Sequence, residues 1–273
     1  SGKLFRQITA VFGGRLRLMI CGGAAINPQV LNGIGDFGIL ALQGYGLTEC
    51  SPMGALNPDT APNPSSIGVC FPGFELKTVD LNEEGIGEIC IRGDNVMMGY
   101  YQMPEETAAV IDEDQWFHTG DLGYIDENGY AYITGRKKNV IITKNGKNVY
   151  PEELEYQLSL SPYIEESFVF SSTQPGESDI SIVASIRPDM EFIREELPTE
   201  PTDQDIKTIL WEEVDKINKT APLYRRIRKL ILRKKEFIKN TSNKLVRFAE
   251  KNKVEEKYKT EQNERLQNRA KWS

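Results

Sequence analysis

A hairpin signal near the middle of the chain constrains the fold more than any other feature of the sequence. Asn128-Gly129 stands between two short runs of β-prone residues, where a two-residue type I′ turn is expected. If these two residues form the loop, counting outward brings Asp121 directly opposite Arg136, and opposed residues share one face of a sheet. The sequence therefore predicts that a carboxylate, which only accepts hydrogen bonds, lies beside a guanidinium with five donors.

This carboxylate–guanidinium pair suits the vicinal hydroxyls of a ribose, because it offers acceptors and donors side by side. By itself the pairing is also consistent with an ordinary surface ion pair, which contributes little to stability. A single β-bulge between the turn and the pair would break the predicted register. The residue pattern alone leaves both interpretations open.

Three segments around this hairpin resemble a known family. HTGDLG (118–123), TGRKKNVI (134–141) and NGKNVYPEELE (145–155), in this order and spacing, are similar to the late core motifs of the AMP-forming acyl-CoA synthetases. These enzymes belong to the adenylate-forming superfamily, with the luciferases and the adenylation domains of peptide synthetases. The resemblance implies that Asp121 and Arg136 hold the ribose of AMP and that Ile133 also binds the nucleotide.

The N-terminal part of the chain predicts a strand, helix, strand unit. A helix is expected over 4–12, then a strand over 16–21, a helix that starts at Pro28, and a strand over 39–42. A formal GxGxxG match at 33–38 follows a helix and precedes a strand, the reverse of the dinucleotide-binding order, so it predicts a helix-ending turn. Gly23 and Ala24 are better nucleotide-binding candidates, because small residues just after a strand let a flat ring approach the backbone.

The segment QGYGLTE (43–49) resembles the YGxTE motif of the same family. Its Gly-Tyr-Gly, taken alone, predicts only a turn. With the downstream motifs, the resemblance implies that adenine stacks on Tyr45, that Thr48 bonds an acyl or phosphoryl oxygen, and that Glu49 holds Mg²⁺. The other nucleotide-binding candidates of this segment are Gln43, Gly44 and Gly46.

The predicted fold class combines α/β and α+β parts. Short β-prone runs alternate with glycine-containing turns over 65–101, which predicts a small antiparallel β-barrel or folded sheet. Residues 1–137 are expected to form the C-terminal part of a large adenylate-forming domain, with the strand, helix, strand unit at 1–52 and the β-rich subdomain at 53–137. Residues 138–253 are expected to form a smaller, mobile α+β domain, and 254–273 a polar tail.

Helix and strand signals continue after the second hairpin signal, Asn145-Gly146. Pro151 begins a helix, strands are expected over 166–170 and 180–186, and Thr202 with Asp205 resembles a capping box at the start of another helix. The acidic segment 190–201 contains two prolines and predicts an exposed, mobile connection.

A basic segment near the C-terminus ends in a further motif. Residues 223–253 contain twelve Lys and Arg against two Glu, which predicts a solvated face with local phosphate contacts. The superfamily usually has Thr-x-x-Gly-Lys here, so Asn243 departs from the common form. Thr241 to Arg247 instead match the Thr-x-x-Lys-hydrophobic-x-Arg variant associated with bacterial long-chain fatty acyl ligases. The resemblance implies that Lys244 holds the carboxylate and α-phosphate oxygens during adenylation.

The resemblance also implies two reaction steps and two orientations of the C-terminal domain. A carboxylic acid, expected to be a fatty acid, reacts with ATP to give acyl-adenylate, and the thiol of CoA then displaces AMP. The pivot maps to Lys138, two residues after Arg136. Lys244 faces the site in the first step, and the hairpin of Asn145 and Gly146 faces it in the second. The implied ligands are ATP or AMP, Mg²⁺ and CoA.

Some function classes lack their residues in this sequence. The four cysteines have no CxxC spacing and His118 is the single histidine, so zinc sites and His-dependent triads lack parts. No apolar run reaches about 18 residues and no signal peptide is present, which predicts a cytoplasmic protein. Peripheral membrane contact is left open, and no nucleic-acid partner is expected.

The Ser/Thr/Gly-rich phosphate loop of the family does not occur in this sequence. The chain is therefore expected to be the C-terminal half of a synthetase and to be inactive alone. Two alternatives stay open. One is an aryl-CoA ligase or carrier-protein adenylation domain of the same superfamily. The other is a non-enzymatic module whose basic segment binds a membrane or nucleic acid.

Overall fold

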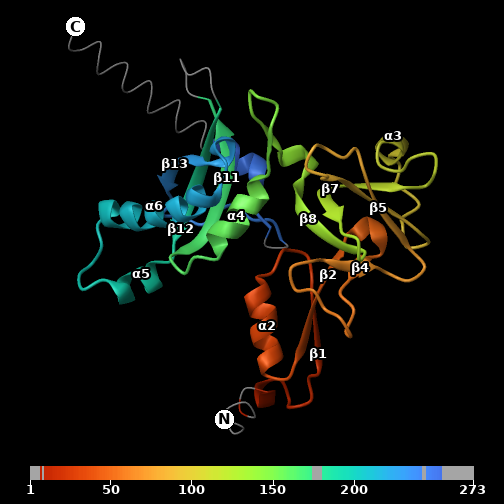
Figure 1. Cartoon of the computed structure of the whole chain (residues 1–273), viewed down its shortest axis with the longest axis horizontal. Helices are drawn as coiled ribbons and strands as arrows, with labels where there is room; N and C mark the ends of the chain where they lie inside the picture. Colours follow the sequence, from red (N-terminus) through yellow and green to blue (C-terminus); the bar gives the residue numbers. More distant parts are fainter. Residues whose placement is uncertain (1–6, 8, 174–179, 242–243, 254–273) are drawn as a thin grey trace. The chain divides into compact units, whose positions relative to one another are not determined.

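The computed structural model describes residues 7, 9–173, 180–241 and 244–253 (Figure 1). The chain divides into two compact units, Ser1–Val140 and Ile141–Ser273. The sequence placed the boundary between residues 137 and 138. No helix in the described ranges combines the length and the apolar character needed to cross a membrane.

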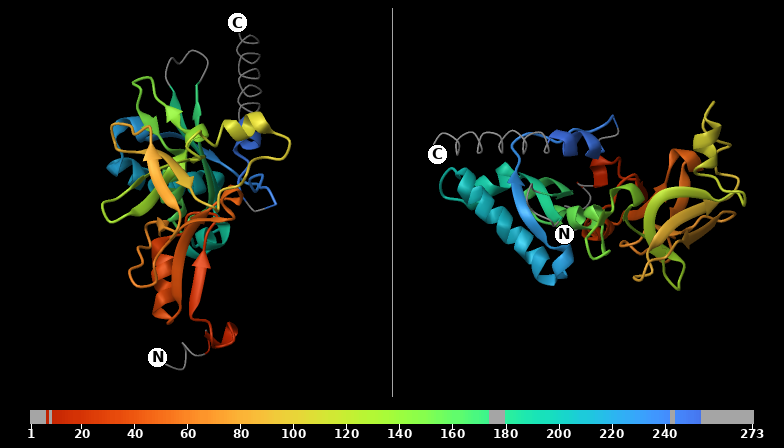
Figure 2. Two further views of the ribbon diagram at one scale, coloured as in Figure 1. Left: turned by 90° about the vertical axis from the view of Figure 1, so that its right-hand side faces the viewer. Right: turned by 90° about the horizontal axis from the view of Figure 1, so that it is seen from above.

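An eight-stranded sheet forms the framework of the first unit. Its strands are β1 (Leu18–Cys21), β2 (Leu40–Gly46), β3 (Met53–Leu56), β4 (Gly68–Cys70), β5 (Glu75–Val79), β6 (Gly87–Arg92), β7 (Phe117–Ile125) and β8 (Tyr130–Arg136). They lie in the order β1-β2-β3-β4-β8-β7-β6-β5, with β1 and β2 parallel and the other neighbours antiparallel. The helix α2 (Pro28–Asp36) lies along β2 (Figure 2), and the short helix α3 spans Pro104–Ala108.

The sheet is strongly curved, so its edge strand β5 packs over strands from the middle of the sheet. Leu76 of β5 lies against a buried cluster of Ala55, Ile67 and Ala131, of which Ala55 belongs to β3 and Ala131 to β8. The β-rich part is therefore the folded antiparallel sheet that the sequence predicts. Its strands also continue the β1–β2 pair, so the two predicted parts of this region share one sheet.

The Gly44-Tyr45-Gly46 segment is the end of strand β2, and the turn expected from its composition alone is wrong. These residues pair with β3, with a register shift between Tyr45 and Gly46. A Cβ atom at Gly46 would lie 1.7 Å from the carbonyl oxygen of Pro52. Glycine is required because the two backbones approach too closely for any side chain.

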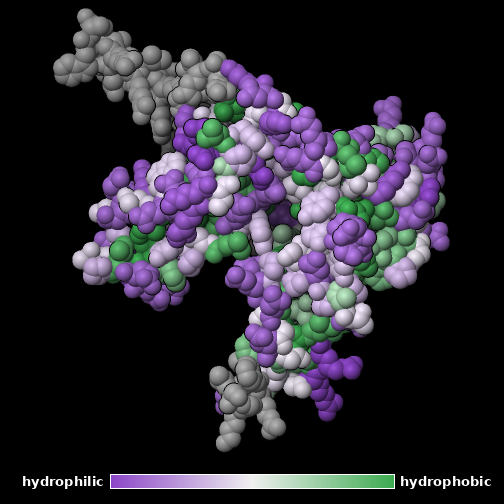
Figure 3. Space-filling model, in the orientation of Figure 1, coloured by the Kyte–Doolittle hydropathy of each residue, from purple (hydrophilic) through white to green (hydrophobic). Residues whose placement is uncertain are grey.

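The predicted helix at Pro28 is confirmed as α2, and the GxGxxG match lies at its C-terminal end. The side chain of Asn27 caps the helix by accepting from the N–H of Gln29 at 2.8 Å. Of the helix predicted over 4–12, residues 7 and 9–11 are helical, whereas 4–6 and 8 lie outside the described residues. Leu18 and Ile20 of β1 are exposed, and Figure 3 shows apolar surface around β1 and α2.

The turn between β7 and β8 has three residues, so the predicted two-residue type I′ turn is wrong. The N–H of Asp126 donates to the carbonyl of Tyr130 at 2.9 Å, which closes a loop of residues 127–129. Within that loop only Gly129 has a positive φ, 81°. A type I′ turn needs positive φ at both central residues, whereas this three-residue loop needs it at one.

The predicted pairing of Asp121 with Arg136 is nevertheless confirmed. The longer loop shifts the register by one residue near the turn. Thr134 then inserts one extra residue on β8 as a β-bulge, and the pairing beyond it regains the predicted register. Two departures from the predicted hairpin thus cancel at the position of the pair.

The second unit packs its helices on a three-stranded sheet. Its elements are β9 (Ile141–Ile142), β10 (Asn148–Val149), α4 (Pro151–Ser159), β11 (Ile164–Ser172), β12 (Ser181–Pro188), α5 (Met190–Glu196), α6 (Asp203–Thr220) and β13 (Ile227–Leu232). β12 pairs antiparallel with β11 and parallel with β13. The predicted helix at Pro151, both strands and the capping box of Thr202 and Asp205 are confirmed. The β9–β10 loop, residues 144–146, again has three residues instead of two.

The acidic segment 190–201 begins with the helix α5, so the predicted mobile connection is wrong for its first half. Asp189 caps the helix by accepting from the N–H of Phe192 at 3.0 Å. Ile193 is fully buried in the core, and Met190 and Leu197 pack against the same cluster. The three apolar residues are spaced so that they share one face of the helix. Their burial stabilises the helix although the composition of the segment is acidic.

The basic segment 223–253 is less solvated than the sequence predicts. Three of its arginines are mostly buried and form ion pairs with carboxylates of the same unit, namely Arg225 with Glu153, Arg233 with Glu250 and Arg247 with Glu155. Residues 247–253 are helical, and 242–243 and the predicted tail 254–273 lie outside the described residues. The predicted phosphate and membrane contacts stay predictions.

Removing the buried side chain of α5 should destabilise the second unit. Ile193→Ala is expected to lower its free energy of unfolding by about 2–5 kcal/mol, because the substitution leaves a cavity in a closed core. Urea unfolding followed by circular dichroism measures the change. Glu195→Ala, on the exposed face of the same helix, is the control and should have little effect. Equal unfolding midpoints for both variants would contradict the packing of α5.

Candidate active site

The Thr-Gly-Asp segment at 119–121 interrupts the ladder between β6 and β7. The register shifts there, so three residues of β7 stand opposite Ile89 alone. Gly120 has a φ of 71°, which favours glycine. The hydroxyl of Thr119 donates to the carbonyl of Ile89 at 2.7 Å and accepts from the N–H of Asp121 at 3.1 Å. The bulge thus has its own hydrogen bonds, which hold Asp121 in place.

The Asp121 carboxylate lies between two partners. The hydroxyl of Tyr45 donates to Oδ2 at 2.5 Å, and Nε of Arg136 lies 2.7 Å from Oδ1. Asp121 is 4 % exposed, whereas the side chain of Arg136 is 40 % exposed. A buried carboxylate needs such partners to offset the loss of its hydration. The result is an anchored acceptor beside a guanidinium that solvent can reach.

The ring of Tyr45 packs against two hydrophobic clusters, one around Cys50, Ile91 and Phe117 and one around Ala55, Ile67 and Ala131. Burial, together with the neighbouring Asp121 carboxylate, raises the pKa of its hydroxyl far above the ordinary value. Tyr45 therefore stays protonated and serves as a permanent donor to Asp121. The stacking of adenine on this ring stays a prediction.

The predicted residues after β1 lie at the same end of the sheet as the end of β2. Cys21 is the Cα partner of Gln43, and a Cβ atom at Gly22 would lie 3.2 Å from the carbonyl oxygen of Gly44. Gly23 and Ala24 follow directly and are exposed. The carboxyl ends of parallel strands are where α/β sheets commonly bind ligands. The fold therefore brings these two predicted segments together.

Glu49 and Thr48 lie in a short 3₁₀ turn, Thr48–Cys50, directly after β2. Thr48 is exposed, and the hydroxyl of Tyr100 donates to Oε1 of Glu49 at 3.0 Å. A pocket of about 490 Å³ opens beside Glu49 and Tyr100, and its lining also includes Gly120 and Arg136. Among the described residues, no group of three or more His, Cys, Asp or Glu could hold a metal ion. A single carboxylate still suits Mg²⁺ that is also held by water and substrate phosphates.

One buried acid beside this site is absent from the sequence-based predictions. Glu88 of β6 is 5 % exposed and contacts Gly120, His118 and Lys137. The alternation in GEICIR does place Glu88 and the buried Cys90 on one strand face, opposite Ile89 and Ile91. A carboxylate on a strand face that carries buried residues could have been recognised as needing partners.

The remaining predicted site residues lie nearer the C-terminus. Ile133 of β8 is exposed, and Lys138 is exposed in the 3₁₀ turn Lys137–Asn139 that ends the first unit. Asn145 and Gly146, in the β9–β10 loop, and Lys244 are exposed residues of the second unit. Their roles in nucleotide binding, pivoting and catalysis stay predictions.

The raised pKa of Tyr45 can be measured by spectrophotometric titration. In the folded chain, Tyr45→Phe should show the same rise in tyrosinate absorbance up to about pH 11 as the wild type, because Tyr45 does not ionise there. In denaturant, where every tyrosine is exposed, the variant should lack one tyrosinate. A smaller rise in the folded variant would mean that Tyr45 ionises in the folded wild type below about pH 11, which would contradict the raised pKa.

Comparison with known proteins finds two family models, one after the other, in this chain. The AMP-binding enzyme model matches residues 3–101, and the AMP-binding enzyme C-terminal domain model matches residues 138–265. The long-chain-fatty-acid–CoA ligase FadD15 of Mycobacterium bovis is 36% identical over 172 residues, which cover 63% of this chain and 28% of that protein. Human long-chain-fatty-acid–CoA ligase 1 is 33% identical over 198 residues, 70% of this chain and 28% of that protein.

A solved structure is similar to this chain in fold. The crystal structure of ATP-bound MatB from Rhodopseudomonas palustris superposes with a TM-score of 0.71 at 29% identity, over 95% of this chain and 48% of that one. The chain spans less than a third of the length of the two ligases and about half of MatB. The models, the relatives and the fold agree with the motifs, and the chain belongs to the AMP-binding enzymes.

Proposed function

We propose that this chain supplies the ribose-binding part and the C-terminal domain of an AMP-forming fatty acyl-CoA ligase. The observation that carries the proposal is the Asp121 carboxylate, held by Tyr45 and paired with Arg136 on the Thr-Gly-Asp bulge. This carboxylate can accept from ribose hydroxyls, and the exposed guanidinium can donate to them. The family of the chain supports an adenosine nucleotide as the ligand.

The proposed reaction has two steps that depend on charge and position. A carboxylate attacks the α-phosphorus of ATP and pyrophosphate leaves; the thiol of CoA then attacks the acyl-adenylate, giving the thioester and AMP. In the first step Arg136 and Asp121 fix the ribose, and Thr48 bonds an oxygen at the reacting centre. Fixed donors aimed at developing charge are the largest source of such rate enhancement.

Glu49 is the residue of this chain that would hold Mg²⁺, together with phosphate oxygens and water. The ion would neutralise charge on the departing pyrophosphate. The hydrogen bond from Tyr100 fixes the direction of the Glu49 carboxylate. Burial and this hydrogen bond raise the pKa of Tyr100, so its hydroxyl stays a donor.

A fatty acid is the proposed acyl substrate. The relatives that support it are the two long-chain-fatty-acid–CoA ligases, at 36% and 33% identity. The Thr-x-x-Lys-hydrophobic-x-Arg form of the Lys244 motif also favours this group over aryl ligases. CoA is the proposed acceptor because these relatives are named as CoA ligases.

The second unit is proposed to alternate between two orientations about Lys138. Lys244 would serve adenylation, since its charge is useful where the carboxylate meets the α-phosphate. The β9–β10 hairpin would serve thioester formation by lining the path of the pantetheine arm with closely approaching backbone. A single-residue hinge between two compact units is a recognised form of domain motion.

Neutralising Asp121 should weaken nucleotide binding. Asp121→Asn keeps the shape of the side chain but loses its charge and one acceptor, so the affinity for AMP should fall about 10- to 100-fold. Isothermal titration calorimetry on the chain measures the change. Glu127→Gln removes the same charge from the exposed turn of the same hairpin and should leave the affinity unchanged. An unchanged affinity in Asp121→Asn would remove Asp121 from the ribose site.

The two half-reactions should separate in a full-length ligase that contains this chain. Lys244→Ala should slow adenylate formation by about a hundredfold or more, yet still convert supplied acyl-adenylate and CoA to thioester. Gly146→Leu should do the reverse. Single-turnover assays of each step measure both effects.

The control for Gly146→Leu is Gly129→Leu, in a loop of the same three-residue geometry. The two glycines have φ values of 71° and 81°, so leucine strains both loops alike. Gly129→Leu should leave both half-reactions near their wild-type rates. If Lys244→Ala and Gly146→Leu impair the two steps equally, the alternation proposal fails.

A further inference from the structure

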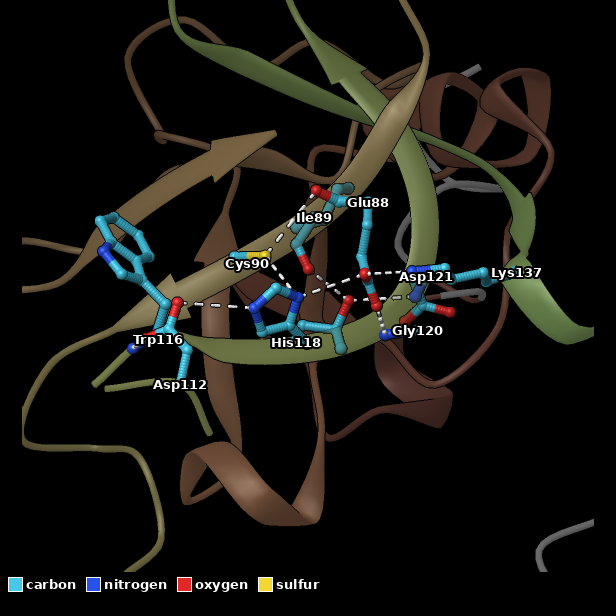
Figure 4. Close-up of polar contacts among 10 residues, drawn as sticks. Glu88, Ile89, Cys90, Asp112, Trp116, His118, Gly120, Asp121 and Lys137 are labelled. Atoms are coloured by element: carbon cyan, nitrogen blue, oxygen red, sulfur yellow. Dashed lines mark hydrogen bonds and ion pairs between the residues drawn. The ribbon is translucent and has the colours of Figure 1, made fainter. Parts of the chain in front are cut away.

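The buried acid Glu88 connects the two strands that carry the ribose-binding pair. Its Oε1 accepts from the N–H of Gly120 at 3.0 Å, and its Oε2 lies 2.8 Å from Nζ of Lys137 (Figure 4). Gly120 directly precedes Asp121 on β7. Lys137 directly follows Arg136, which is the last residue of β8. One carboxylate on β6 therefore holds the chain neighbours of both members of the pair.

The backbone pairing of β7 is interrupted where Glu88 contacts it. The bulge at 119–121 removes regular ladder bonds between β6 and β7, and the second bulge, at Thr134, lies a short distance away on β8. At a bulge the direction of the side chain depends on contacts other than the regular ladder bonds, and the hydrogen bonds of Thr119 supply some of these contacts. The Glu88 carboxylate supplies a fixed acceptor at this place, and its bond to Gly120 replaces a missing ladder bond.

His118 holds the Glu88 carboxylate from the other side. Its Nδ1 lies 3.2 Å from Oε2 of Glu88, and its Nε2 lies 3.5 Å from Oδ2 of Asp112 (Figure 4). Asp112 in turn accepts from the N–H of Trp116 at 2.8 Å. The imidazole is thus fixed between two carboxylates, and Glu88 cannot turn away from Gly120 without losing this contact.

The protonation state of Glu88 agrees with this role. Burial alone would raise the pKa of the carboxyl, but the bonds from Lys137, His118 and the Gly120 N–H outweigh it and lower the pKa. Glu88 is therefore ionised at neutral pH and accepts all three bonds. A neutral amide at this position would keep acceptor capacity on one atom only.

We propose that Glu88 is a positioning residue of the ribose site. By holding Gly120 and Lys137 it fixes the spacing and direction of Asp121 and Arg136 for a vicinal diol. The inference rests on the proposed role of this pair in binding ribose. In this role Glu88 acts through its neighbours Gly120 and Lys137.

The test compares two ligands that differ only in the diol. AMP and 2′,3′-dideoxy-AMP are titrated into the wild-type chain and into Glu88→Gln, and the ratio of their dissociation constants is the readout. The wild type should prefer AMP. In Glu88→Gln this preference, expressed as the ratio of the two dissociation constants, should fall by about five- to tenfold. The affinity for the dideoxy compound should stay near the wild-type value. A general loss of structure would weaken the binding of both ligands alike and leave the ratio of their dissociation constants unchanged.

The matched control is a carboxylate on β5, the other neighbour of β6 in the sheet. Glu75 of β5 accepts two hydrogen bonds of 2.8 Å from the guanidinium of Arg92 of β6, so this ion pair joins β5 to β6. Glu75→Gln removes a carboxylate from an ion pair of the same sheet, and it should retain the wild-type preference for AMP. Thermal unfolding of each variant checks that the chain is folded.

The possible outcomes are distinct. If the wild type does not prefer AMP over the dideoxy compound, the ribose assignment fails and the Glu88 inference fails with it. If the wild type prefers AMP and folded Glu88→Gln keeps the same preference, only the Glu88 inference fails. If Glu88→Gln does not fold, the variant Lys137→Met provides the test instead. The Lys137 side chain is 58% exposed, and replacing it removes the ion pair between Glu88 and the end of β8 but keeps the contact between Glu88 and Gly120. That variant should also lose part of the preference, and an unchanged ratio would overturn the inference.

Discussion

The burial of the Asp121 carboxylate is the constraint on which the first unit depends. Removing a carboxylate from water costs several kcal/mol unless partners replace the hydration. Its partners here are Tyr45 on β2 and Arg136 on β8. In the sheet order, β3, β4 and β8 lie between β2 and β7, so the hydrogen bond from Tyr45 forms only because the sheet curves back on itself. The same bond therefore satisfies the buried acid and connects distant strands.

The hairpin shows how far sequence reasoning reaches. The β-prone runs around Asn128-Gly129 predicted two paired strands and the opposition of Asp121 and Arg136, and both are observed. The turn geometry was wrong, because Asn-Gly is compatible with a two-residue loop and with a three-residue loop whose last position is glycine. The extra residue at Thr134 compensates for the difference. Periodicity predicted the strands, but the bulge depends on tertiary packing that a local pattern does not encode.

The parts that the sequence did not predict are those fixed by contacts between distant residues. Glu88 and Gly120 are separated by about thirty positions, and their bond exists only because β6 and β7 pair with an interruption. The family resemblance implied which residue holds the ribose but not what holds that residue. In the second unit, the acidic composition of 190–201 concealed Ile193, which is fully buried. Composition averages over a segment, whereas packing depends on single positions.

The ion pairs of the second unit bear on the proposed rotation. Arg233, which directly follows β13, pairs with the buried Glu250, and Arg247 pairs with Glu155 of α4, so the segment that carries Lys244 is tied to β13 and to α4. Between these ties, the N–H of Asn240 donates to the carbonyl of Lys244 at 2.9 Å, and Val246 donates to Ile238 at 2.8 Å. These contacts fix the backbone at Lys244 relative to β13.

The hydrophobic clusters of the described residues also each belong to a single unit. A change of φ and ψ at Lys138 would therefore break none of these clusters. The Glu88–Lys137 ion pair lies one residue before this pivot and ties the chain to the first unit up to that point. The proposed rotation would then begin immediately after the Asp121–Arg136 pair and carry Lys244 with the rest of the second unit, while the contacts that hold this pair stay within the first unit.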